Sequence, residues 1–435
     1  MNSTIFALAS APGRAGVGVV RLSGPAAGAI AQGVAGPLPP PREAALRRLT
    51  DGGAEIDHAL LLWFPAPHSF TGEDVAEFHI HGGRAVREAL FAALSARGAR
   101  VAEPGEFSRR AVENGKLDLT RAEAVADLVD AETPAQLRQA LRQHDGVLAD
   151  LYEGWRSRLI AALGRAEAAI DFSDDGVGES EFVAAQQAAG EIIKEIQSHM
   201  DDAGRGESLR EGLKLTILGP PNVGKSSLIN ALARRPVAIV SDIPGTTRDV
   251  IEVRLNLGGY LLHVADTAGV RETGDAIEAE GVRRALSHAA GGLTLLLLDG
   301  SLPDPRAGMP PGLPEPDLIV WNKADLFDQG LVREGLCISL KTGVGLSMLQ
   351  DLLQQKVQQK LESKDGAPLL TRPRHRQALA EALQALRHGL QAPADRPELL
   401  AEDLRLAMRA VGRITGRVDV EELLDFVFRD FCIGK

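Results

Sequence analysis

The sequence predicts a protein of the α/β plus α class, in which a mixed α/β domain comes first and a second α/β domain is inserted into a helical domain. Three observations predict this arrangement. Over about the first 115 residues, short apolar strands alternate with helical patterns. Apolar residues at helical spacing then run from Leu117 to about Gly204 and return after Arg376. Between these two helical parts lie five motifs, each of which follows a strand. Such an insertion is tolerated where the two ends of the inserted chain lie close together.

The composition indicates an ordinary folded protein in a reduced compartment. The 435 residues fit about three domains, and 44% of them are hydrophobic. No apolar run approaches the ~20 residues of a membrane span, and no basic stretch followed by an apolar one marks a secretory signal. Because two cysteines build no disulfide framework, we expect a cytoplasmic setting and no membrane partner.

The net charge of −11 argues against a broadly basic nucleic-acid binder. A contact with RNA would therefore need a local basic patch, and one cluster fits: Arg372, Arg374, His375 and Arg376. The same cluster can equally be the solvated start of a helix.

The first domain, expected at 1–116, mixes strands and helices. Thr4–Ala9 and Val17–Leu22 predict strands, and Arg84–Ala96 predicts a helix. The glycine-rich stretch Gly13–Gly18 lies between the two strands and has no helix after it. We therefore interpret it as a hairpin connection rather than a dinucleotide-binding fingerprint.

The helical domain is expected in two parts, 117–210 and 366–435, around an insert at 211–365. The helical pattern of the first part is interrupted at Asp171–Gly178. Three further helices are expected in the second part, at Arg376–Leu390, Pro397–Ile414 and Val418–Phe431.

The insert opens with a phosphate-binding loop. Gly219–Ser227 fits the pattern G-x-x-x-x-G-K-[ST], and it lies between an apolar strand, Leu213–Leu218, and a helical pattern, Ser226–Ala233. The backbone N–H groups of such a loop curl around phosphates, and the helix N-terminus adds a partial positive charge. Lys225 is expected to reach the β- and γ-phosphates, and the Ser226 hydroxyl is expected to bind Mg²⁺.

The next motif points to guanine. Asn322–Asp325 follows the strand Leu318–Trp321, and the Asp325 carboxylate can accept both N1–H and the 2-amino group of guanine. Adenine offers no such pair of donors, so ATP would leave a carboxylate unpaired. We expect the Lys323 stem to cover the base and Asn322 to tie this loop to the phosphate loop.

Three further motifs complete the set in the right order. Gly245–Asp249 supplies a switch threonine, Asp266–Gly269 ends the strand Tyr260–Ala265 and would hold Mg²⁺ through water, and Ser339–Lys341 would support the base. Together they predict a Ras-like P-loop GTPase domain with its ligand at the carboxyl ends of parallel strands. The expected GTP contacts are Asn222, Val223, Gly224, Lys225, Ser226, Ser227, Ser241, Asp242, Ile243, Pro244, Gly245, Thr246, Thr247, Asp266, Thr267, Ala268, Gly269, Asn322, Lys323, Asp325, Ser339, Leu340 and Lys341.

Two usual GTPase parts are missing. Val270 stands where many GTPases place the glutamine that orients the attacking water, so Glu278 or Glu272 is a candidate for that role; Glu278 can equally be a solvated carboxylate at a helix start. No arginine finger is evident, although Arg248 and Arg271 are near, and Asn222 could hold a monovalent cation instead. The six prolines of 301–316 rule out a regular helix there.

Further motifs carry a resemblance over the whole chain. They are Pro12–Gly18, Phe70–Val75, His81–Gly83, Pro104–Phe107, Lys116–Leu119 and Phe431–Lys435. With the GTPase set, they make the chain similar to the MnmE (TrmE) family of tRNA modification GTPases. The resemblance implies a homodimer that works with an MnmG-type FAD-dependent partner, as a heterotetramer, to add a carboxymethylaminomethyl group at carbon 5 of the tRNA wobble uridine.

The resemblance also implies the ligands. The N-terminal domain is similar to a tetrahydrofolate-binding and dimerisation fold, in which 5-formyl- or methylene-tetrahydrofolate would contact Arg21, Glu77, Lys116 and Lys435. K⁺ would be held by Asn222, Ser241, Ile243 and Thr246, and Mg²⁺ by Ser226 and Thr247. The K⁺ would take the place of an arginine finger, with Lys225 and Glu278 as catalytic residues.

Two interpretations stay open for Cys432. As a nucleophile it could attack carbon 6 of uridine and so activate carbon 5; as a structural residue it ends an apolar helix. An alternative function for the chain as a whole is a regulatory GTPase that binds RNA or ribosomes without modification chemistry.

Overall fold

The computed structural model describes residues 3–172, 177–202, 204–239, 252–265, 291–307, 309, 313, 315–327, 334–362, 369–418, 424–425, 427–429, 431 and 434. The chain divides into two compact units. The first unit comprises Met1–Ala126, Gln143–Arg156 and Val411–Lys435, and the second comprises Asp127–Arg142 and Ser157–Ala410.

A six-stranded sheet forms the first unit, in the order β3-β4-β5-β2-β1-β6. All its neighbouring strands are antiparallel except β1 and β6, which are parallel. The strands are β1 (Ile5–Leu8), β2 (Gly18–Ser23), β3 (Ala45–Asp51), β4 (Ala54–Phe64), β5 (Val75–Ile80) and β6 (Arg100–Val101). The predicted connection at Gly13–Gly18 is confirmed, because β1 and β2 pair directly and no helix intervenes.

Helices cover this sheet unequally on its two faces. The apolar stripes of α1 (Ala27–Ala35) and α2 (Arg84–Ala96) pack into the larger core with Phe78 and Leu61 of the sheet. The shorter α3 (Glu106–Glu113) contributes Phe107 to a small cluster on β1. The α2 range agrees with the prediction to the residue.

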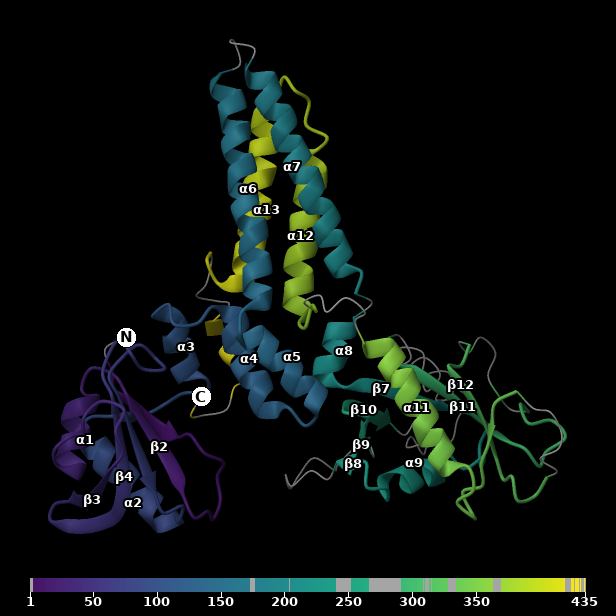
Figure 1. Ribbon diagram of the computed structural model, residues 1–435, viewed down its shortest axis with the longest axis horizontal. Coiled ribbons are helices and arrows are strands. Elements are labelled where there is room, and N and C mark those ends of the chain that lie inside the picture. The colour runs from purple at the N-terminus through teal and green to yellow at the C-terminus, as the bar shows by residue number, and fades with distance from the viewer. Residues whose placement is uncertain are drawn as a thin grey trace, which may run out of the picture. The chain divides into compact units, whose positions relative to one another are not determined.

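Long helices follow the first sheet in the chain: α4 (Leu119–Asp130), α5 (Pro134–His144), α6 (Val147–Asp171), α7 (Val177–Met200), α12 (Pro373–Gly389) and α13 (Pro397–Thr415). Within the second unit, α7 packs lengthwise on α12 beside parts of α6 and α13 (Figure 1). Ion pairs join these helices, with Arg158 on Glu195 at 2.7 Å and Arg405 on Glu167 at 2.8 Å. The predicted interruption is confirmed, because α6 ends at Asp171 and α7 begins at Val177.

A seven-stranded sheet lies in the second unit, in the order β13-β12-β11-β7-β10-β9-β8. The strands from β13 to β10 are parallel, and β9 and β8 run antiparallel to their neighbours. The strands are β7 (Leu213–Leu218), β8 (Ala238–Ile239), β9 (Glu252–Leu257), β10 (Tyr260–Ala265), β11 (Leu293–Asp299), β12 (Leu318–Asn322) and β13 (Leu336–Cys337).

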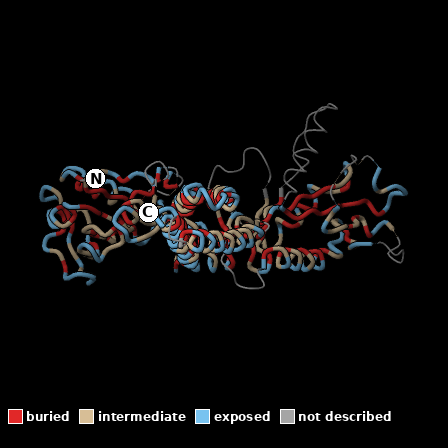
Figure 2. Tube along the Cα trace, turned by 90° about the horizontal axis from the view of Figure 1, so that it is seen from above, coloured by how far each residue is buried: buried red, intermediate tan, exposed pale blue. Residues whose placement is uncertain are grey.

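The second sheet is buried at its centre. Every residue of β11 is buried, as expected for a parallel strand covered on both faces, and buried residues run through these strands in Figure 2. The helices α9 (Lys225–Ala233) and α11 (Leu346–Leu361) supply much of the surrounding core. The predicted α/β plus α class is confirmed, and the described part of 301–316 contains no helix, as the prolines predict.

One carboxylate of the helical domain, that of Asp127, contacts the chain at both ends of the insert. The helix α8 (Arg205–Glu211) leads into β7, and the chain returns through Arg372 into α12. Asp127 accepts hydrogen bonds from Arg210 Nε at 2.9 Å and from Arg372 Nη2 at 2.8 Å. Both ends of the insert are therefore within reach of the same side chain.

The basic cluster at the start of α12 is partly buried, and two of its arginines are paired with carboxylates. His375 is fully buried, Arg372 is paired with Asp127, and Arg376 donates to Asp202 at 2.9 Å. The cluster does stand at a helix start, but Arg372 and Arg376 belong to a network of ion pairs at the joint of the insert rather than facing solvent alone, and the contact with RNA stays a prediction.

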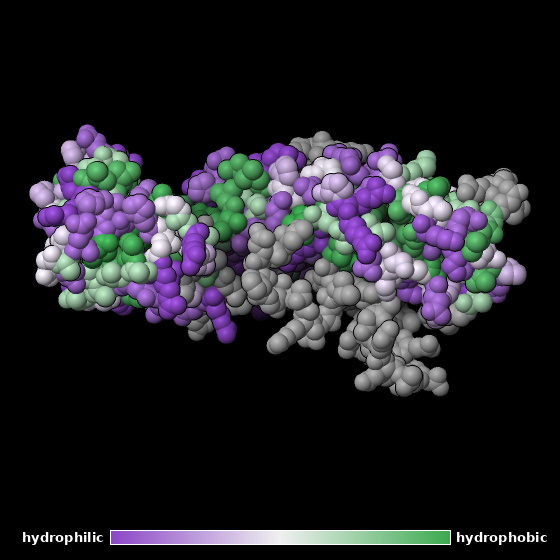
Figure 3. All heavy atoms as spheres, turned by 90° about the horizontal axis from the view of Figure 1, so that it is seen from below, coloured by the Kyte–Doolittle hydropathy of each residue, from purple (hydrophilic) through white to green (hydrophobic). Residues whose placement is uncertain are grey.

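No helix among the described residues is long and apolar enough to cross a membrane. The face of the molecule seen in Figure 3 mixes hydrophilic and hydrophobic side chains.

Candidate nucleotide site and N-terminal ligand site

The phosphate loop lies where the parallel strands end. It follows β7 at the centre of the sheet, and α9 begins at Lys225 behind Gly224, whose left-handed φ of 105° suits glycine. No side chain caps α9, so the backbone N–H groups of its first turn face the loop without a side-chain acceptor. This is the arrangement that binds phosphate at a helix N-terminus.

The glycines of the loop are needed for space as well as conformation. A Cβ atom on Gly219 would lie 2.2 Å from the Leu297 carbonyl oxygen, and one on Gly224 would lie 2.8 Å from Asn322 Nδ2. Asn222 also adopts a left-handed φ of 63°, which an asparagine tolerates better than most residues. The loop backbone therefore closely approaches β11 and the end of β12.

Lys225 is poised over the loop. Its ammonium donates to the carbonyl oxygens of Gly219 at 2.7 Å and Pro220 at 2.8 Å. These carbonyl groups hold the side chain folded back on the loop, on the side where the phosphate groups of a nucleotide would lie.

Asn322 ties the second motif to the first, as predicted. The side chain is 4% exposed; its Nδ2 donates to the Val223 carbonyl at 2.8 Å, and its Oδ1 accepts from Leu340 N at 3.2 Å. One buried amide thus connects the phosphate loop, the end of β12 and the loop after β13.

Ser339 supports Asp325. The Ser339 hydroxyl donates to Asp325 Oδ1 at 2.6 Å, and this hydrogen bond holds the pKa of the Asp325 carboxyl below its usual range. The Ala324 N–H also donates to the Ile338 carbonyl at 2.9 Å, which fixes the two loops together. The carboxylate is therefore charged at neutral pH and can accept the two donors of guanine.

One residue of this site was missed from the sequence. Asp299, at the end of β11, accepts a hydrogen bond from Lys323 Nζ at 2.6 Å. The available signal was a single carboxylate ending an otherwise apolar strand, Leu293–Asp299, beside the strand that carries Asn322.

Many predicted site residues lie outside the described residues. For the nucleotide and its metals, these are Ser241, Asp242, Ile243, Pro244, Gly245, Thr246, Thr247, Asp266, Thr267, Ala268, Gly269 and Glu278. At the C-terminus, Cys432 and Lys435 also lie outside.

The N-terminal unit holds two of the predicted ligand residues together. Arg21 on β2 and Glu77 on β5 are register partners, and the Arg21 guanidinium donates to Glu77 Oε1 at 2.9 Å. The guanidinium also lies over the rings of Phe70, at 5.1 Å, and Phe107, at 5.7 Å. Lys116 is exposed and lies beside Gly72, where a Cβ atom would be 3.2 Å from Lys116 Cε.

A buried ion network supports this region, and sequence reasoning missed it. Arg110 is 2% exposed and pairs with Glu106 at 2.8 Å and with Glu73 at 3.0 Å. Burial alone would raise the pKa of Glu106, but hydrogen bonds from Arg100, the Glu103 N–H and Arg110 outweigh it and hold that pKa below its usual range. Glu73 and Glu106 belong to two of the family motifs, so these motifs have a structural role as well.

The C-terminal motif packs on the same unit. Phe431 stacks edge-on against Phe428 with ring centroids 4.9 Å apart, and a Cβ atom on Gly434 would lie 2.1 Å from the Leu8 carbonyl oxygen. Phe431 thus packs into the cluster of Leu119 and Ala122, and Gly434 lies against the end of β1.

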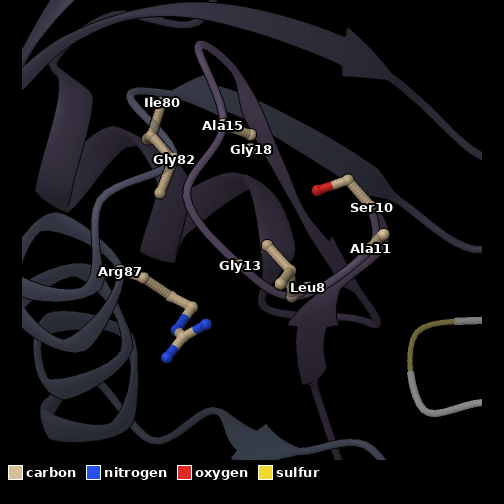
Figure 4. Close-up of a pocket in the computed structure, with 9 residues that line it drawn as sticks. All are labelled: Leu8, Ser10, Ala11, Gly13, Ala15, Gly18, Ile80, Gly82 and Arg87. Atoms are coloured by element: carbon tan, nitrogen blue, oxygen red, sulfur yellow. The ribbon is translucent and has the colours of Figure 1, made fainter. Parts of the chain in front are cut away.

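A small hollow opens beside the glycine-rich connection. Figure 4 shows Arg87 extending towards it from α2, and Ser10, whose hydroxyl accepts from Val19 N at 3.2 Å, on its other side. The remaining lining is mostly backbone and small residues: Leu8, Ala11, Gly13, Ala15, Gly18, Ile80 and Gly82.

Comparisons with known proteins agree over the whole length. The family described as the MnmE helical domain matches residues 119–432, and the GTP-binding protein TrmE N-terminus matches residues 4–116. Among relatives, the tRNA modification GTPase MnmE of Rhodospirillum rubrum is 54% identical over 457 residues, covering 99% of each chain.

Two further relatives carry the same name. The protein of Paramagnetospirillum magneticum is 54% identical over 447 residues and covers 100% of both chains. That of Parvibaculum lavamentivorans is 52% identical over 441 residues, covering 99% of this chain and 100% of the relative. With the motifs and the site geometry described above, these matches show that the chain belongs to the MnmE family of tRNA modification GTPases.

Proposed function

We propose that this chain binds and hydrolyses GTP and that hydrolysis serves the modification of tRNA. The observation that carries the proposal is the linked geometry of Asn322, Ser339 and Asp325 beside the phosphate loop. A charged carboxylate held by a serine suits the paired donors of guanine, and a buried amide connects base recognition to the phosphate loop. Nucleotides without those donors would leave the carboxylate unpaired.

We further propose the metal ligands. Ser226 and Thr247 would hold Mg²⁺, and Asn222, Ser241, Ile243 and Thr246 would hold K⁺. The left-handed backbone at Asn222, within a loop that approaches its neighbours closely, supports a special role for this residue. When bound, the cation would supply positive charge near the β- and γ-phosphates, while Glu278 would help to orient the attacking water.

The N-terminal domain is proposed to hold a tetrahydrofolate one-carbon donor through Arg21, Glu77, Lys116 and Lys435. The support is chemical: basic side chains pair with the carboxylates of a folate tail, and Glu77 can accept from the donor-rich pterin ring. Because Arg21 and Glu77 pair with each other in the free protein, a ligand would have to share or replace that contact.

The remaining assignments belong to the same proposal. We place the domain boundaries at 1–116, 117–210, 211–365 and 366–435, and we propose a cytoplasmic homodimer that works with an MnmG-type FAD-dependent partner on the tRNA wobble uridine. The role of Cys432 is tested by Cys432→Ser, which retains the size of the side chain but removes a thiol nucleophile.

The first experiment compares GTP hydrolysis in K⁺ and Na⁺ buffers for the full chain and for Asn222→Ala. We expect strong stimulation by K⁺ that is lost in the variant. Asn256→Ala, which removes one hydrogen bond in the β9–β10 turn, serves as the matched control and should keep the stimulation. Equal rates in both salts would refute the K⁺ site and favour an arginine finger from Arg248, Arg271 or a partner.

A second measurement tests the base. Asp325→Asn keeps one acceptor for N1–H but replaces the oxygen that faces the guanine 2-amino group with an amide donor, which suits the 2-carbonyl of xanthine, so affinity should move from guanine towards xanthine nucleotides. Unchanged preference for GTP in this variant would contradict the proposed recognition of guanine.

A further inference from the structure

Asp299 is built into the edge of the nucleotide site. It ends β11 directly opposite Asn322 in the parallel register with β12, and its side chain is 7% exposed. The Gly300 N–H donates to the Asn322 carbonyl at 3.0 Å, which fixes the end of β11 against the guanine motif.

Both oxygens of this carboxylate have defined partners. Oδ1 accepts from Ser301 N at 2.9 Å and from Ser301 Oγ at 2.6 Å, so the turn after β11 fixes the orientation of the carboxylate. Oδ2 accepts from Lys323 Nζ at 2.6 Å. Ser301 therefore fixes the orientation of the carboxylate, and its second oxygen accepts from Lys323.

Lys323 is held at both ends. Its backbone has a left-handed φ of 65°, an uncommon conformation for a lysine, and Leu326 N donates to its carbonyl at 2.8 Å. The side chain is 37% exposed, and its ammonium is anchored on Asp299. The backbone fixes the direction in which the side chain leaves, and Asp299 fixes where it ends.

This geometry suits a side chain that covers an aromatic base. A lysine free in solvent samples many rotamers, and ordering it on binding costs affinity. Anchoring the ammonium in the free protein lowers that cost and holds the four-carbon stem between the Lys323 backbone, after β12, and Asp299, at the end of β11.

We propose that Asp299 is a positioning residue of the nucleotide site, which orders the Lys323 stem as one wall for the guanine base before the nucleotide binds. The inference rests on the proposed GTP binding and adds a residue that acts through Lys323 rather than on the nucleotide. It predicts that Asp299 contributes to affinity but not to the choice of base, which Asp325 makes.

A double-mutant cycle on the full chain tests the inference, with equilibrium and stopped-flow binding of a fluorescent GDP analogue as the readout. Asp299→Asn keeps an acceptor for Ser301 but loses the charge that holds Lys323. We expect about tenfold weaker binding, mostly through faster release, because a charge-assisted hydrogen bond is lost. Lys323→Ala should weaken binding at least as much, and adding Asp299→Asn to it should change nothing further.

The controls separate the possible explanations. Asp304→Asn changes an exposed carboxylate in the loop after β11, and this variant should bind as the unmodified chain does. Within the described part of the chain, that carboxylate accepts one long hydrogen bond, from Arg306 N at 3.3 Å. Relative affinity for GDP over IDP should stay the same in Asp299→Asn. Additive losses from Asp299→Asn and Lys323→Ala would overturn the positioning role, as would binding within twofold of the unmodified chain. Failure of the unmodified chain to bind the GDP analogue would overturn the proposed function itself.

Discussion

Replacing Asn322 by alanine is the sharpest test of how the nucleotide site is held together. The substitution removes the side chain that joins the phosphate loop, through Val223, to the loop carrying Leu340. It touches neither the proposed guanine acceptor nor the lysine of the phosphate loop. Because Asn322 is also among the expected GTP contacts, a loss of binding would report on the connection between the loops together with any direct contact of Asn322 with the nucleotide.

The magnitude follows from the two hydrogen bonds and their burial. Each bond contributes about 0.5–1.5 kcal/mol, and the bond to the Val223 carbonyl is fully buried, so its loss also leaves an acceptor unpaired at a cost of about 1–3 kcal/mol. Asn322→Ala should therefore cost a total free energy of about 2–3 kcal/mol. If it falls on binding, GDP affinity drops by about 30- to 150-fold.

The assay is titration with a fluorescent GDP analogue, together with urea unfolding to detect any part of the cost that falls on stability. Asn256→Ala removes one hydrogen bond from the turn between β9 and β10 and should leave GDP affinity unchanged. Asn322→Asp keeps the acceptor for Leu340 N but places a carboxylate against the Val223 carbonyl, so it should bind no better than alanine. If Asn322→Ala stays within threefold of the unmodified chain in affinity and loses no stability, the reasoning is refuted.

Three further predictions concern stability. Arg110→Met should cost about 3–5 kcal/mol because it removes the buried cation that Glu106 and Glu73 share. The loss seen in urea unfolding should shrink towards pH 4, where stability that depends on the depressed pKa of Glu106 is also lost in the unmodified chain; an undiminished cost at low pH would contradict this. Asp127→Ala should cost about 2–3 kcal/mol because it removes the carboxylate that Arg210 and Arg372 share, and proteolysis at the joint should rise; unchanged proteolysis would argue against a role of Asp127 in holding the ends of the insert together. Burial lowers the pKa of His199 to about 4, so the folded state disfavours protonation of this side chain. The free energy of unfolding should therefore be highest above pH 6.5 and fall by at most ~3 kcal/mol towards pH 4. His199→Gln should reduce this dependence on pH in unfolding experiments.

The fold was largely predictable because its signals are local. The α2 helix and β10 follow from apolar spacing, and the phosphate loop follows from its glycines, because each signal lies within a few consecutive residues. The link from Asn322 to the phosphate loop was also predictable, since parallel strands bring their carboxyl ends to one edge.

The unpredicted features depend on partners far apart in the chain. Arg110 is buried only because Glu73 and Glu106 meet it from two other segments, and no periodicity reveals such a meeting. The sequence around Arg372 predicts a basic cluster because no acidic residue lies close to it in the chain. The carboxylates that pair with the cluster come from Asp127 in α4 and from Asp202 in the turn after α7. Asp299 could be recognised in the sequence as a lone charge at the end of a strand. Its contact with Lys323 depends on the register of β11 with β12, which the sequence does not reveal.

The single carboxylate at the joint of the insert has a consequence for evolution and for signalling. Because Asp127 binds both Arg210 and Arg372, the GTPase segment is a closed loop with respect to the helical domain. Doubling the length of such a loop costs only about 0.6 kcal/mol, so the segment can gain or lose turns, including the proline-rich stretch, with little effect on the host. A motion that separates the two ends of the insert would have to break the hydrogen bonds at Asp127, whereas a rearrangement that keeps the ends together can reach the helices through other contacts, such as that of Ala135 N with the Gly259 carbonyl.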